Sequence, residues 1–108
     1  MHKYTQINLV LKDYFDLNKN VKRIPAKNMM PYLVLAGIFS KDEKNGLPII
    51  YLLKKLERQN QLHFIPFVTA VKKEVYTKLY FENKTFSTDK ILSIQSKIIK
   101  AKKAKNKL

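Results

Sequence analysis

The sequence contains no cysteine and no tryptophan, and only 8 of its 108 residues are acidic. Without cysteine there is no disulfide framework, no thiolate zinc site and no cysteine nucleophile, which fits a reducing cytoplasm. No apolar run approaches the roughly 18–20 residues of a membrane span. Residues 1–11 also lack the long apolar stretch of a signal peptide. We therefore expect a cytoplasmic protein, nucleoid-associated in a bacterium, with no membrane contact.

Residues that commonly serve in catalysis or bind metals form no recognisable group. Gly37 and Gly46 are the only glycines and do not make a phosphate-holding loop. His63 has no carboxylate at a recognisable spacing, and neither close pair of acids has a histidine beside it. These pairs are Asp13 with Asp16 and Asp42 with Glu43. We expect no enzymatic activity, no metal, no cofactor and no small-molecule substrate.

Lysine is the residue in excess. The chain has 22 basic residues and a formal net charge of +14, yet only Arg23 and Arg58 are arginines. A genome rich in A and T explains lysine in place of arginine, but it does not explain the shortage of acids. A polyanion is the simplest partner for the positive electrostatic field that this net charge creates. The length allows one domain.

Three segments have a helical period. Apolar residues recur at helical spacing in 6–17, with Thr5 as a possible N-cap. A second helix is expected over 27–39, capped near Asn28, with Pro31 in its first turn and Gly37 allowing close helix packing. After a polar turn over 40–46, ended by Gly46, a third helix is expected from Pro48 to Asn60.

The helix expected over 48–60 has two distinct faces. Its apolar residues cluster within about 100° of arc. The opposite face carries one aromatic and three basic residues. The apolar set is Ile49, Leu52, Leu53 and Leu56, and the opposite set is Tyr51, Lys54, Lys55 and Arg58.

The period changes after Asn60. Residues 62–68 and 78–82 are expected strands, joined by a basic loop over 69–77. Pro66 makes the first an edge or bulged strand. Ser87 or Thr88 is expected to cap a last helix from about Asp89, and residues 102–108 are expected to form a flexible basic tail.

This order of elements resembles a winged helix-turn-helix domain, an α+β fold with three helices and a β-hairpin wing. The resemblance covers roughly residues 6–82 and predicts a winged-helix domain over 1–86, followed by a C-terminal helix over 87–101. It implies that helix 48–60 enters the major groove of DNA and that residues 69–78 form the wing. The turn over 40–47 is longer than a tight helix-turn-helix turn.

The resemblance and the charge pattern indicate the same nucleic-acid-binding residues. Arg58 is suited to bidentate readout of guanine, and the lysines to phosphates. A solvated helix face is the alternative for the charged residues, and half-buried packing for Tyr51. The predicted set is Tyr51, Lys54, Lys55, Arg58, Lys72, Lys73 and Lys78, with Lys102, Lys103 and Lys105 in the tail.

The last helix carries an apolar stripe that needs a partner. Ile91, Ile94 and Ile98 either pack back on the domain or pair with a second copy of the chain. The resemblance and the small core favour a homodimer, which would read two related half-sites.

Double-stranded DNA is therefore the expected partner, bound by a transcriptional regulator or an accessory factor of a mobile element. A winged-helix module that binds proteins is one alternative. A non-specific binder of RNA or single-stranded DNA is another. Its main anchor would be the C-terminal lysine tail. Separately, exposed aromatics on the strands would stack single-stranded bases, although burial is the usual fate of such rings. These aromatics are Phe64, Phe67, Tyr80 and Phe81.

Overall fold

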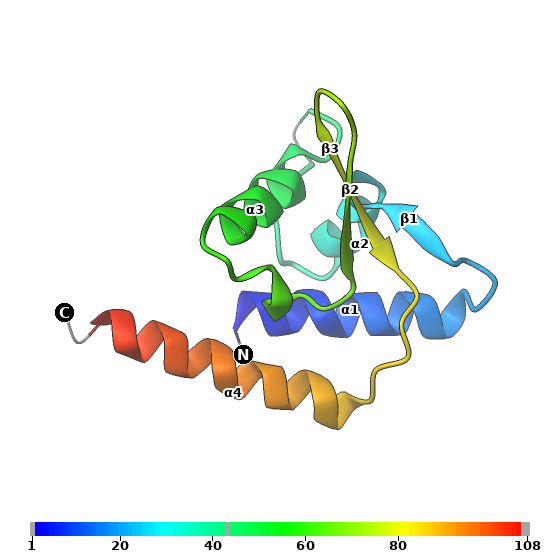
Figure 1. Cartoon of the computed structure of the whole chain (residues 1–108). Helices are drawn as coiled ribbons and strands as arrows, with labels where there is room; N and C mark the ends of the chain where they lie inside the picture. Colours follow the sequence, from blue (N-terminus) through cyan, green and yellow to red (C-terminus); the bar gives the residue numbers. More distant parts are fainter. Residues whose placement is uncertain (1, 43, 107–108) are drawn as a thin grey trace.

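The computed structural model describes residues 2–42 and 44–106, with side chains as far as Ala101. This part of the chain forms four α-helices and a three-stranded antiparallel sheet, an α+β fold (Figure 1). Two short 3-10 helices, η1 (Ala26–Met29) and η2 (Leu62–Phe64), precede α2 and β2. The α-helices are α1 (Lys3–Leu17), α2 (Met30–Leu35), α3 (Leu47–Arg58) and α4 (Thr88–Asn106), and the strands are β1 (Arg23–Pro25), β2 (Val68–Lys72) and β3 (Thr77–Glu82).

Helix α1 begins earlier than its apolar period predicted. His2 is the N-cap, and its Nδ1 accepts a hydrogen bond of 3.1 Å from the backbone N–H of Tyr4. The prediction that Thr5 caps the helix is wrong, because Thr5 lies inside the first turn and is fully buried. The expected apolar face is present, and Ile7, Leu11 and Phe15 enter the core.

Helix α2 is shorter than predicted and ends at Leu35. Gly37 has φ of +76°, and the N–H groups of Gly37 and Ile38 donate to the carbonyls of Val34 and Leu33. These two hydrogen bonds are those of a Schellman motif, which stops a helix at a left-handed residue. The prediction of close packing at Gly37 is wrong, because a Cβ there would meet nothing within 4 Å. Pro31 lies in the first turn as predicted.

Helix α3 begins directly after Gly46, which has φ of +94° and donates its N–H to Asp42 Oδ1 at 2.7 Å. The backbone of η1 (Ala26–Met29) passes so close that a Cβ on Gly46 would collide with Lys27. Ile49, Leu53 and Leu56 are fully buried, and Leu52 is half-buried beside them, which confirms the apolar face.

The sheet has the strand order β1-β3-β2. The expected strand over 62–68 is wrong: Leu62–Phe64 forms η2, and strand β2 starts only at Val68. The adjacent residues Phe64 and Ile65 are both buried, which breaks strand alternation, and proline has no N–H for a ladder. Lys73 closes the hairpin by donating its N–H to the Tyr76 carbonyl at 2.7 Å. Strand β1 was not predicted at all.

Helix α4 lies along α1 and runs in the opposite direction (Figure 1). Ser87 caps it, as its Oγ accepts from the N–H of Lys90 at 3.1 Å. Ile91, Ile94 and Ile98 are buried in the core of their own chain. In this single copy of the chain the three side chains therefore pack back on the domain, which is one of the two expected arrangements, and the homodimer stays a prediction. No helix in the described part of the chain is long and apolar enough to cross a membrane.

Candidate nucleic-acid interface

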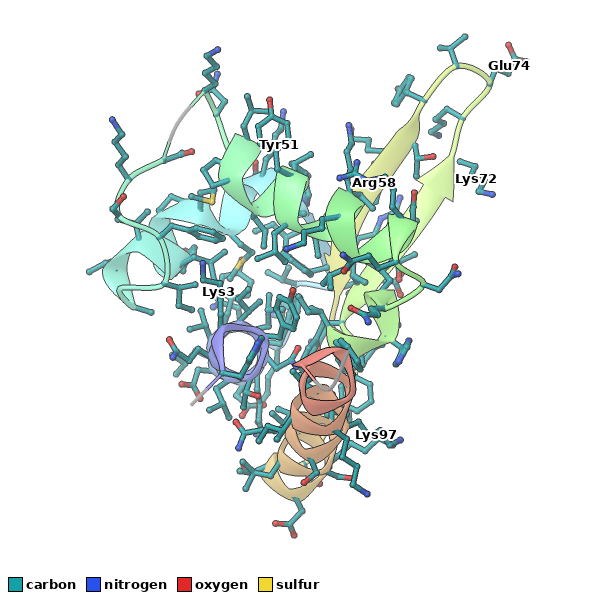
Figure 2. All side chains as sticks on the ribbon, turned by 90° about the vertical axis from the view of Figure 1, so that its left-hand side faces the viewer. Lys3, Tyr51, Arg58, Lys72, Glu74 and Lys97 are labelled. Carbon is teal, nitrogen blue, oxygen red and sulfur yellow. The ribbon has the colours of Figure 1, made fainter. Side chains whose placement is uncertain are left out.

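The exposed face of α3 brings together the four residues that its period predicted. Tyr51 is 61 % exposed, and Lys54, Lys55 and Arg58 are also exposed, while Leu53 and Leu56 lie beneath them in the core. We call these four residues the α3 ridge. In Figure 2, Tyr51 and Arg58 mark its two ends. A helix with this packing must turn these four side chains toward solvent.

The charges of the α3 ridge are not neutralised within the part of the chain that the structure describes. An ion pair on α1, far from the ridge in the sequence, joins Lys12 Nζ to Asp16 Oδ2 at 2.6 Å. Lys54, Lys55 and Arg58 make no salt bridge with a described carboxylate. Their positive charge is therefore directed outward, where it attracts a polyanion.

The hairpin formed by β2 and β3 projects beside α3 and carries the next predicted set (Figure 2). Lys72 ends β2, Lys73 begins the turn and Lys78 lies on β3, and all three are exposed. The Lys78 amine lies 5.4 Å from the ring centroid of Tyr80, on the outer face of the sheet. The turn between the strands also carries Glu74 and an almost fully exposed valine, Val75, at 90 %.

A groove of about 200 Å³ separates α3 from the hairpin. Lys54 and Ile50 line it from α3, and Tyr76 lines it from the hairpin. Lys27 also borders this groove, and sequence reasoning missed it. No local pattern marks Lys27, because its place follows from the close contact between η1 and Gly46.

A second hollow, of about 430 Å³, lies on the other side of the ridge. Tyr51 and Lys55 border it from α3, Phe39 from the segment after α2, and Lys3 from the start of α1. The Lys3 amine lies 5.2 Å from the centroid of the Phe39 ring. Lys3 was also missed, because nothing in its sequence neighbourhood shows that α1 begins beside α3.

The strand aromatics do not form an exposed stacking platform. Phe64, Phe67 and Phe81 are buried. Tyr80 is half-buried on the outer face of the sheet, where the Arg23 guanidinium lies 4.2 Å from its ring centroid. A single tyrosine already covered by arginine does not provide the successive surfaces that unpaired bases need.

The remaining ionisable side chains are dispersed. His63 is exposed and contacts the ring of Phe64, with 4.7 Å between centroids. Residues 2–42 and 44–106 contain no group of three histidines or acids able to hold a metal ion. Burial raises the pKa of the Tyr4 phenol above its ordinary value.

The side chains of Lys102, Lys103 and Lys105 lie outside the described part, although the backbone of α4 continues to Asn106.

Comparison with protein-family models, with curated proteins and with solved structures finds no match to this chain.

Proposed function

We propose that this protein is a winged helix-turn-helix module that binds double-stranded DNA, with α3 in the major groove and the hairpin as the wing. The order of three helices followed by a hairpin supports this fold. Strand β1 supports it further, because its pairing with β3 ties the hairpin to the segment between α1 and α2. A small basic domain of this kind suits a transcriptional regulator or an accessory factor of a mobile element.

The observation that carries the proposal is the α3 ridge beside a projecting basic hairpin. A helix with its side chains is about 10–12 Å wide and fits a major groove about 12 Å wide. The ridge directs one aromatic and three cationic side chains outward over residues 51–58 of α3. Arg58 is the side chain with the planar fork that binds guanine O6 and N7, and the lysines pair with phosphates.

A titration of nucleic acids tests the proposal. Random duplex DNA, duplex RNA and single-stranded DNA are titrated at two salt concentrations, and tight duplexes are then selected from a random pool. We expect duplex DNA to bind best. On the selected duplex, Arg58→Ala should cost about 1–3 kcal/mol of binding free energy if Arg58 makes a bidentate base contact.

Lys19→Ala is the matched control, because Lys19 is an exposed lysine in the loop after α1, away from α3. Equal losses for Arg58→Ala and Lys19→Ala would show that the charge alone matters and that α3 is not the reading helix. Equal affinity for duplex and single strands would favour a non-specific binder. Binding to no nucleic acid at low salt would favour a module that binds an acidic protein.

A further inference from the structure

The hollow between α3 and the start of α1 has the chemistry of a binding site for a phosphorylated ligand. Its walls include the rings of one phenylalanine and two tyrosines together with the His2 imidazole, and two lysines border it. Among the described residues, no carboxylate lines it. Aromatic surface suits a sugar or a base, and ammonium groups suit a phosphate. The rings belong to Tyr4, Phe39 and Tyr51, and the lysines are Lys3 and Lys55.

The position of the hollow relative to the α3 ridge indicates which phosphate it would receive. Lys54 borders the groove beside the hairpin, and Lys55 borders the hollow. Successive residues lie about 100° apart around a helix, so these two lysines flank the exposed face of α3, one toward each hollow. A helix in the major groove has one backbone strand of the duplex on each side. The hairpin adjoins the first strand, and the hollow faces the second.

Lys3 is held at the hollow by the anchored backbone of α1 and by an aromatic ring beneath its amine. The next residue, Tyr4, is buried and stacks on Phe64, with 6.3 Å between ring centroids, so the first turn of α1 is anchored in the core. The Lys3 amine lies above the Phe39 ring at 5.2 Å from its centroid. A cation over an aromatic face is favourable but leaves its other N–H donors directed outward. Lys3 is exposed and available to an anion at this rim.

We infer that this hollow binds one sugar–phosphate unit of the DNA strand on the side of α3 away from the hairpin. Lys3 and Lys55 pair with the phosphate oxygens, and the ring of Tyr51 packs against the deoxyribose. The inference rests on the proposed binding of duplex DNA by α3. Contacts on both sides of α3 then set its tilt in the groove, because the helix is held between two backbones.

The test compares Lys3→Gln with Lys19→Gln, two variants that each remove one exposed lysine near an end of α1. Loss of one phosphate contact weakens binding roughly eightfold at about 0.1 M salt. It also makes the negative slope of log affinity against log salt shallower by about 1. We expect this change for Lys3→Gln only. A selected duplex is then neutralised at one phosphate at a time with methylphosphonate. Neutralising one position on the strand away from the hairpin should weaken binding by the wild type more than binding by Lys3→Gln, which keeps only the Lys55 contact to that phosphate.

The outcomes separate this inference from the proposed function. If Lys3→Gln behaves like Lys19→Gln while Arg58→Ala loses affinity, α3 still reads DNA and the hollow is not a phosphate site. If no duplex binds at all, the proposed function fails, and a titration with AMP followed by amide NMR shifts decides about the hollow. Shifts confined to Lys3, Phe39 and Tyr51 would identify a site for a free nucleotide. Absence of shifts would overturn the site.

Discussion

Gly46 and Lys27 lie against each other where η1 meets the start of α3. An ideal Cβ on Gly46 would lie 2.6 Å from the Cα of Lys27 and 2.9 Å from its carbonyl oxygen. Because these are backbone atoms, the contact cannot be relieved by rotating a side chain. The contact positions α3 relative to η1 and places Lys27 at the rim of the groove beside the hairpin.

Gly46→Ala is therefore expected to destabilise the protein by about 3 kcal/mol, from overpacking together with left-handed strain. Gly37→Ala is the matched control, because Gly37 also has a positive φ but has open space around it. It should cost only the strain, about 1 kcal/mol. Urea unfolding measures both values. Equal losses would show that the approach of η1 to α3 is not a tight contact.

Among the elements, α4 is the one whose packing partner the sequence left open. Its isoleucines were predicted either to pack back on the domain or to pair with a second copy, and in the structure they complete the core of their own chain. The apolar stripe predicted that a surface would be covered, but a stripe contains no information about which chain covers it. Ile99, the neighbour of Ile98, is 42 % exposed and lies outside that packing.

Ile98→Ala should destabilise the monomer by about 2–4 kcal/mol, since it leaves a cavity at a fully buried position. Ile99→Ala removes the same atoms from an exposed position and should cost less than about 1 kcal/mol. Thermal or urea unfolding at several protein concentrations checks this. A loss from Ile98→Ala that grows with dilution would instead indicate that α4 packs against a second copy.

The elements also show how far local patterns reach. The helical period placed the apolar face of α1 and the two faces of α3 correctly, because burial of one side of a helix repeats every turn. It misplaced β2, because the apolar run around Pro66 points to the core without adopting a strand. It missed β1, since three residues are too few to show alternation and this strand exists only through its pairing with β3.

At the scale of the whole molecule, the fold gathers charges that are far apart in the sequence. The fold adds charges from two other parts of the chain to those of the α3 ridge. The hairpin lysines lie on one side of α3, and Lys3 lies on the other (Figure 2). The C-terminal end of α4 lies on the same side of the molecule as α3 and the start of α1 (Figure 1). The sequence of this end is rich in lysine, and we expect it to add attraction to the DNA that α3 is proposed to bind.

The triple substitution of Lys102, Lys103 and Lys105 by Gln should weaken binding to all nucleic acids and leave the preference for duplex DNA unchanged. The negative slope of log affinity against log salt should become shallower by at most about 3, since each lysine neutralises no more than one phosphate. Lys19, Lys22 and Lys90, substituted together by Gln, form the control with the same change in charge. A changed preference in the first variant would assign sequence readout to the end of α4.

The sequence by itself determined the helical faces, the excess of positive charge and the identity of the exposed residues on α3. These properties depend on neighbours within one or two helical turns, where the separation of two residues in the sequence fixes their relative position in space. Only the tertiary structure decided that α4 covers α1, that Lys27 borders one side of α3, and that Lys3 borders the other. Such contacts join residues far apart in the chain, and their geometry follows from packing the whole core at once rather than from any local pattern.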